Sequence, residues 1–143
     1  MPQNGYSVGR DISLNVMTPS GQLVINRITG FDCKQETSKT KVKRLDGIND
    51  SLRFFEGWSG SFSVERADSI VEDYFVQLEE NYYAGLNEQP ATILETITNP
   101  DGSTSQYRYE RVILSLDDAG NWQGDTTVKI KVSFEAARKR QVL

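Results

Sequence analysis

The sequence predicts a mainly β protein, an antiparallel β-sandwich or partly closed barrel, with one α-helix. Three observations support this fold class. Apolar and polar residues alternate along several runs, strong turn sequences such as Asn99-Pro100-Asp101-Gly102 separate the runs, and one run near the middle of the chain has helical periodicity. With 143 residues, the chain is expected to form a single domain, 1–143.

The first half of the chain is predicted to consist of extended segments. Residues 12–17 alternate in polarity, 18–21 form a turn, and extended structure resumes at 22–25 and continues to Cys33. Residues 54–65 are predicted to form a strand that packs on one side and carries serines on the other. The residues on its packed face are Trp58, Gly60, Phe62 and Val64.

One amphipathic helix is predicted to follow this strand. Ser69 and Glu72 have the spacing of a capping box, and Asp68 adds negative charge where the helix dipole favours it. Gly85 is a stop signal. The apolar stripe at helical spacing consists of Ile70, Val71, Tyr74, Phe75, Leu78 and Tyr82. We expect this stripe to lie on one sheet or on one end of a barrel.

The last third of the chain is predicted to be an antiparallel meander. Residues 91–98, 105–116 and 126–135 are predicted strands separated by turn sequences, and no element is assigned to 136–143. Tyr107, Tyr109 and Ile113 are predicted to share one face of the middle strand. The last strand alternates apolar Val128, Ile130, Val132 and Phe134 with polar residues.

A polar segment at about 35–52 is predicted to be a long extended loop, and such loops in compact domains are usually functional or disordered. Residues 34–44 hold five basic side chains and one acidic one, whereas residues 65–88 hold seven acidic side chains and one basic one. We expect these segments to meet between copies of the chain, because complementary charge steers association. The candidate interface residues are Lys39, Lys41, Lys43, Arg44, Asp46, Asp68, Glu72 and Asp73.

Two other interpretations of the basic segment remain open. It is also compatible with a solvated, mobile loop, or with a nucleic-acid patch, although no aromatic side chains are interleaved there for base stacking. The net charge of −4 and the pI near 4.9 argue against a surface that grips nucleic acid, because phosphate binding needs clustered Lys and Arg.

The composition also argues against an enzyme. The sequence contains no histidine, which removes the commonest general base and metal ligand and excludes Ser-His-Asp sites and most zinc sites. We therefore expect no catalytic residue, no metal and no cofactor. Cys33 is expected to be a small buried apolar side chain, and a lone cysteine suits a reducing cytoplasm. No membrane span and no signal peptide are expected.

Several stretches resemble the tail tube proteins of contractile-tailed bacteriophages. They are FFEGWSGSFSVERADSIVEDYF at 54–75, ETITNPDGSTSQYRYERVILS at 95–115, VKIKVSFEAARKRQ at 128–141 and the opening GYSVGRDISLNVMTPSG. The resemblance covers nearly the whole chain. It implies a tail-tube-like fold in which subunits form hexameric rings whose sheets join into an inner β-barrel. It also implies that the rings stack into a tube through which DNA passes without specific binding.

The same resemblance implies partners and a location. The partners would be other copies of the chain, a sheath protein and baseplate or terminator proteins, in a virion tail assembled in the host cytoplasm. A tube-initiator or baseplate ring protein and a type VI secretion-like tube protein are alternatives, since related machines share the fold. A net acidic subunit suits a channel for a polyanion, and Ser and Thr in 59–63 and 126–133 are candidates for its lining.

Overall fold

The structure is a computed structural model, and it describes residues 3–23 and 28–142. The described residues form one antiparallel eight-stranded sheet with a helix beside it, which confirms the predicted fold class. The elements in chain order are η1 (Gly9–Asp11), β1 (Ile12–Thr18), β2 (Gly21–Leu23), β3 (Ile28–Lys43), β4 (Asn49–Glu65), α1 (Ile70–Tyr83), β5 (Ala91–Thr98), β6 (Thr104–Asp118), β7 (Lys129–Ala136) and β8 (Arg138–Gln141).

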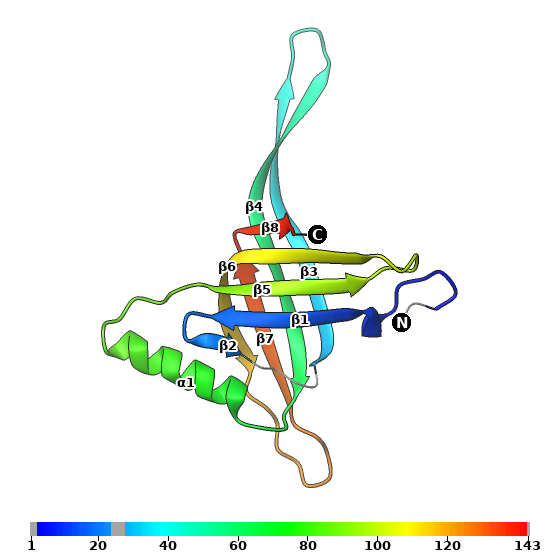
Figure 1. The fold of residues 1–143 in the computed structure, drawn as a ribbon. Coiled ribbons are helices and arrows are strands. Elements are labelled where there is room, and N and C mark those ends of the chain that lie inside the picture. The colour runs from blue at the N-terminus through cyan, green and yellow to red at the C-terminus, as the bar shows by residue number, and fades with distance from the viewer. Residues whose placement is uncertain (1–2, 24–27, 143) are drawn as a thin grey trace.

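The sheet folds over on itself to make two layers. Its strand order is β2-β1-β5-β6-β7-β4-β3, and β8 pairs with β6 outside this path. Strands β1 and β5 lie across β3, β4 and β7 (Figure 1), and β6 belongs to both layers because it pairs with β5 in its first half and with β7 in its second. The described part of the sheet does not close into a barrel, since no pairing joins β2 to β3.

A bulge in β6 changes which of its side chains enter the core. The register of β6 shifts between its pairs with Ala91 and Ile93, and Arg111 there has a positive φ of 54°. The extra residue inverts the alternation, so Val112 is buried as Tyr109 is. Ile113 is 38% exposed, and its predicted position on the Tyr109 face was wrong.

The core lies between the two layers, and each of them contributes to it. The alternation predicted for the last strand is confirmed, and in the 54–65 strand Phe62 and Val64 are buried while Trp58 is half-buried. The buried core cluster consists of Val16, Phe62, Val64, Val71, Ala91, Ile93, Tyr109, Val112, Leu114, Ile130, Val132, Phe134 and Ala136.

Helix α1 confirms most of the predicted stripe. Val71 is buried, and Tyr74 and Phe75 pack against the core, but Tyr82 is 74% exposed because the last turn extends past the sheet. The helix ends before Gly85, whose φ of 79° fits the predicted stop signal.

The predicted capping box between Ser69 and Glu72 was wrong. The Glu72 carboxylate accepts a hydrogen bond from Arg66, and the Ser69 hydroxyl donates to Asp73 Oδ2 at 2.9 Å. The backbone N–H of Ile70 instead donates to Asp68 Oδ1 at 3.2 Å. Because the Glu72 carboxylate pairs with Arg66, it does not cap the helix.

Two predicted boundaries also changed. The strand expected at 22–25 is described as β2 up to Leu23, and its last two residues lie outside the described residues. Residues 138–141, which received no element, form β8 by pairing with 107–110 of β6. In the ranges 3–23 and 28–142, no helix has the length and apolar character needed to cross a membrane.

Candidate assembly surfaces

The β3–β4 hairpin extends well beyond the body of the molecule (Figure 1). Its strands stay paired from Thr37 opposite Phe55 to Lys43 opposite Asn49, and a turn at 44–48 joins them. We call residues 37–55 the arm. The prediction of a long loop at 35–52 was therefore wrong, because the segment is a regular two-stranded ribbon.

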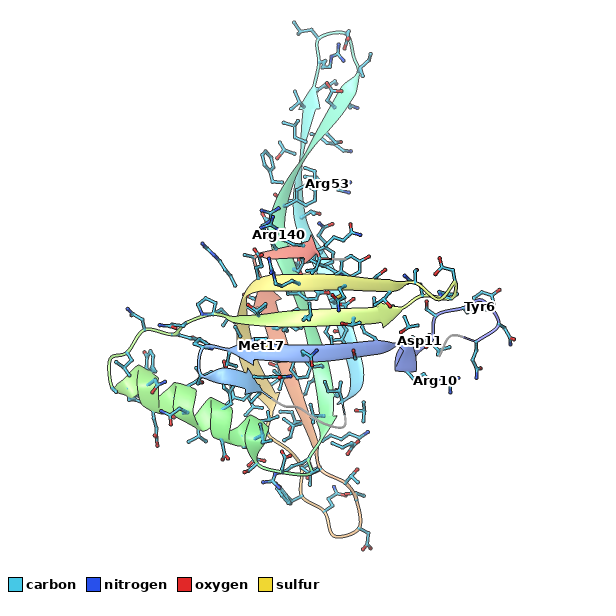
Figure 2. All side chains as sticks on the ribbon, viewed as in Figure 1. Tyr6, Arg10, Asp11, Met17, Arg53 and Arg140 are labelled. Atoms are coloured by element: carbon cyan, nitrogen blue, oxygen red, sulfur yellow. The ribbon has the colours of Figure 1, made fainter. Side chains whose placement is uncertain are left out.

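The arm has one apolar face and one basic face. Residues directly opposite each other in an antiparallel pair point to the same side. Ser38 opposite Phe54, Thr40 opposite Leu52 and Val42 opposite Asp50 define one face, whose apolar side chains are 43–54% exposed. The opposite face carries Lys39, Lys41, Lys43 and Arg53, with exposed Phe55 at its base opposite Thr37. Figure 2 shows the arm's side chains projecting from both sides of the ribbon.

The tip of the arm is held by ion pairs within the hairpin. Arg44 Nη2 lies 3.0 Å from Asp46 Oδ2, and Arg44 Nη1 lies 3.7 Å from Asp50 Oδ2. Two predicted interface residues, Arg44 and Asp46, thus bind each other, while Leu45 beside them is fully exposed. Within the described residues, the core cluster draws no member from the arm. The arm is thus an exposed structure with a stabilised tip.

The three acidic candidates lie together at the start of α1. Asp68 caps the helix, Glu72 binds Arg66, and Asp73 accepts from Ser69. The hydrogen bond from Arg66 to Glu72 raises the pKa of the guanidinium. In one chain the arm and α1 lie at opposite ends (Figure 1), so the structure does not bring the predicted basic and acidic residues together. A contact between them would need two copies.

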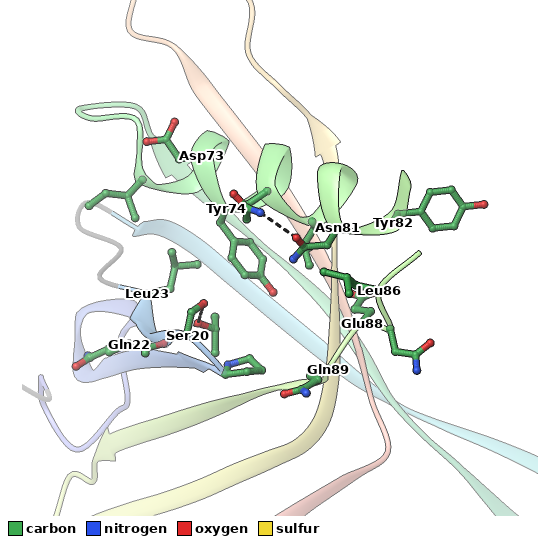
Figure 3. A pocket seen from close by; sticks show the side chains of 17 residues that line it. Ser20, Gln22, Leu23, Asp73, Tyr74, Asn81, Tyr82, Leu86, Glu88 and Gln89 are labelled. Atoms are coloured by element: carbon green, nitrogen blue, oxygen red, sulfur yellow. Dashed lines mark hydrogen bonds between the residues drawn. The ribbon is translucent and has the colours of Figure 1, made fainter. Parts of the chain in front are cut away.

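A groove of about 630 Å³ separates α1 from the β1–β2 turn (Figure 3). One wall is formed by residues 18–23, and the other by α1 and the segment that follows it. Apolar lining side chains include Leu23, Tyr74 and Leu86, and two acidic ones are Asp73 and Glu88. The sequence did not reveal this groove because its walls are about 50 residues apart in the chain.

A polar face with many hydroxyls covers the outer side of β4, β7 and β6. Ser61 lies opposite Ser133, which lies opposite Ser115, so three serines form a row across three strands. The Ser61 hydroxyl donates to Asp32 Oδ1 at 3.0 Å, and Ser133 donates to Asp117 Oδ1 at 2.9 Å. We call this row with its two carboxylates the serine face.

A buried ion pair fastens β8 to the rest of the sheet. Lys139 Nζ lies 3.8 Å from Glu95 Oε1, and it also lies over the rings of Trp58, Tyr107 and Tyr109 at 4.5–5.2 Å from their centroids. Such a cation is attracted by the negative faces of the rings. This cluster could not be predicted from the sequence, because its members come from four strands.

The hydroxyl of Tyr109 completes the cluster. It donates to Glu95 Oε2 at 2.8 Å and lies 3.2 Å from Cys33 Sγ. Burial, together with these two neighbours, raises the pKa of Tyr109 above its ordinary value of about 10. Cys33 is half-buried against the core, close to the prediction of a small buried side chain. In the described part of the chain, no three potential ligand side chains are grouped to hold a metal ion.

Comparisons with known proteins identify the fold. No family model matches the sequence, and no curated protein matches it. Among solved structures, the tube terminating cap of the anti-feeding prophage aligns with a TM-score of 0.62 at 9% identity, covering 99% of this chain and 94% of that one. A chain of the native gene transfer agent virion aligns at 0.56 and 14% identity, covering 95% and 98%.

A third similar structure is the SPP1 tail tube, which aligns with a TM-score of 0.55 at 10% identity over 94% of this chain and 78% of that one. At these identities the likeness concerns the fold. The predicted tail-tube-like fold is therefore confirmed. The similar chains belong to tails, tubes and caps of phage-like particles.

Proposed function

We propose that the protein is a structural subunit of a phage-like tail tube and not an enzyme. Copies would form hexameric rings that stack around a channel for DNA, in contact with sheath, baseplate and terminator proteins in the virion tail. The observation that carries this proposal is the arm, a long ribbon whose apolar face has no place in the core of its own chain. Such a surface is expected to be covered by a partner.

The arrangement of the molecule supports assembly from head to tail. The arm lies at one end of the molecule, and α1, which lines the groove, lies near another (Figure 1), so a contact between the two surfaces would be heterologous. Heterologous contacts generate rings when the rotation closes and filaments when it does not. Both outcomes suit a tube made of stacked rings.

The serine face supports a passive channel. Hydroxyls and carboxylates offer no fixed cation to phosphate, and each phosphate that a protein neutralises adds salt-dependent affinity. The same face carries Lys131, opposite Asp118, and Lys129, 4.0 Å from Glu65, so its cations stand beside carboxylates. A wall centred on Ser61, Ser115 and Ser133 with Asp32 and Asp117 would let DNA slide past. We therefore propose that DNA passes through the lumen without specific binding.

A tube-terminating role is the second candidate. The similar structure with a TM-score of 0.62 is a tube terminating cap, and another is the sheath/tube terminator of an extracellular contractile injection system. A terminator would form a single ring and stop there. Tubes of unlimited length from the purified protein would favour the tube subunit over the terminator.

Deleting Thr40–Asn49 tests the proposal. Lys39 lies opposite Arg53, so residues 50–52 can close the shortened hairpin as a three-residue loop without disturbing the core. Negative-stain microscopy and sedimentation velocity should show rings or tubes for the intact chain and a folded monomer for the deletion. A wild-type chain that stays monomeric at all concentrations, or a deletion that still polymerises normally, would contradict the proposal.

A further inference from the structure

The arm projects from the molecule, the groove is open, and both expose apolar side chains. The arm is a two-stranded ribbon that carries exposed Val42, Leu52 and Phe54 along one face. The groove is open, about 630 Å³ in volume, and its walls carry apolar Leu23, Tyr74 and Leu86 among polar residues. Burying the arm's apolar face there would remove both apolar surfaces from water.

The charges of the two surfaces are also complementary. The arm carries five basic and two acidic side chains. Residues 67–90, which include α1 and one wall of the groove, carry six acidic side chains and no basic one. Glu88 and Asp73 line the groove itself. The basic residues of an approaching arm would therefore be attracted to the acidic residues around the groove, which steers association.

The geometry excludes docking within one chain. Figure 1 shows the arm extending from one end of the sheet and α1 lying beside the other end, so an arm cannot reach its own groove without unpairing β3 from β4. The occupant must come from another molecule. A second copy of this chain supplies the required ribbon, with the apolar and basic faces just described.

We infer that the arm of one copy docks in the groove between α1 and the β1–β2 turn of a second copy. This inference rests on the proposed function and specifies the receiving surface. Each copy then donates an arm and accepts one, which propagates the contact through the assembly.

Photo-crosslinking from the arm tests this contact directly. Phe54 is replaced by benzoylphenylalanine, the full-length protein is assembled and irradiated, and the crosslinked peptides are mapped by mass spectrometry. We expect crosslinks to residues 18–23 or 70–89 of another copy. The control places the same probe at exposed Tyr6, which lies outside the arm on the side of the molecule away from α1 (Figure 2) and should not label these peptides.

A charge-reversal pair provides a second measurement. Glu88→Lys should raise the critical concentration for assembly about two- to fivefold, the range of one exposed ion pair, and adding Lys41→Glu should partly restore it. Asp125→Lys, at an exposed residue outside the groove, is the matched control and should have no effect.

The outcomes separate the inference from the proposed function. Tubes or rings whose Phe54 crosslinks map only outside the groove would overturn the docking site and leave the structural role intact. The same conclusion would follow if Glu88→Lys behaved like Asp125→Lys. A wild-type protein that never assembles would overturn the structural role and the docking site together.

Discussion

Lys139 and Glu95 form an ion pair beneath the C-terminal strand, with 3.8 Å between Nζ and Oε1 and side chains only 16% and 4% exposed. Three aromatic rings surround the ammonium, and the Tyr109 hydroxyl binds the other carboxylate oxygen. The pair therefore joins β8 to β5, two strands that do not pair with each other in the sheet.

Replacing Lys139 with alanine should lower the free energy of unfolding by about 3 kcal/mol, because removing one partner leaves a buried carboxylate without its counter-charge. Urea denaturation monitored by tryptophan fluorescence would measure the loss. Lys129→Ala is the matched control, since its amine is 4.0 Å from Glu65 and its side chain is 72% exposed. That change should cost less than about 1 kcal/mol. Equal losses for the two variants would contradict the role assigned to Lys139.

The raised pKa of Tyr109 predicts a pH dependence at alkaline pH. The folded protein keeps the phenol protonated, whereas the unfolded chain releases the proton above about pH 10. The stabilisation is thus complete below pH 10 and is lost as pH rises beyond it. Urea denaturation at pH 8 to 11 should show wild type losing stability faster than Tyr109→Phe over the upper part of that range. Parallel losses would show that Tyr109 does not contribute.

Gly60 lies where a side chain has no room. A Cβ there would overlap the carbonyl oxygen of Asp32 and would lie 2.9 Å from the Phe134 ring. Gly60→Ala should therefore cost about 2–3 kcal/mol in unfolding free energy, as overpacking does. Gly30→Ala, on the neighbouring strand with open space around its Cβ position, should change stability by less than about 1 kcal/mol. Thermal unfolding of both variants would measure the two losses. Equally small losses would contradict the close packing at Gly60.

The elements that the sequence predicted correctly are those with a periodicity set by a single packed face. Strand β7 buries every second residue from Ile130 to Ala136, and α1 buries Val71 and packs Tyr74 and Phe75 against the core. In both, each residue's environment follows from its neighbours two to four positions away. The face switch in β6 could not be predicted, because the bulge at Arg111 depends on pairing with β5.

The strands of the arm were not predicted because they lack a packed face. Neither of its faces packs in the core of its own chain, so apolar residues do not mark it as a strand. Its one regular signal is the spacing of Lys39, Lys41 and Lys43 at every second residue, which places all three on one face. The basic character was correctly seen as a surface feature, but the groove and β8 depend on pairings between distant segments.

The final prediction concerns the basic face of the arm. Exposed charges are screened over about 8 Å at physiological salt, so raising salt should slow assembly if Lys41 and Lys43 attract acidic residues of another copy. The double change Lys41→Glu and Lys43→Glu should slow it further and should reverse the effect of salt, because repulsion is screened as well. The apolar face of the arm is unchanged in this variant, so assembly should persist at high protein concentration.

Light scattering at several salt concentrations would follow the rate of assembly. The control reverses Lys129 and Lys131, which lie on β7 in the body of the molecule and outside the arm. This control keeps the same net charge as the arm variant, so a difference between the two isolates the position of the charges from their number. Assembly that responds equally to both variants would indicate a general effect of net charge. Assembly that ignores both, and ignores salt, would indicate an interface held by the apolar face alone.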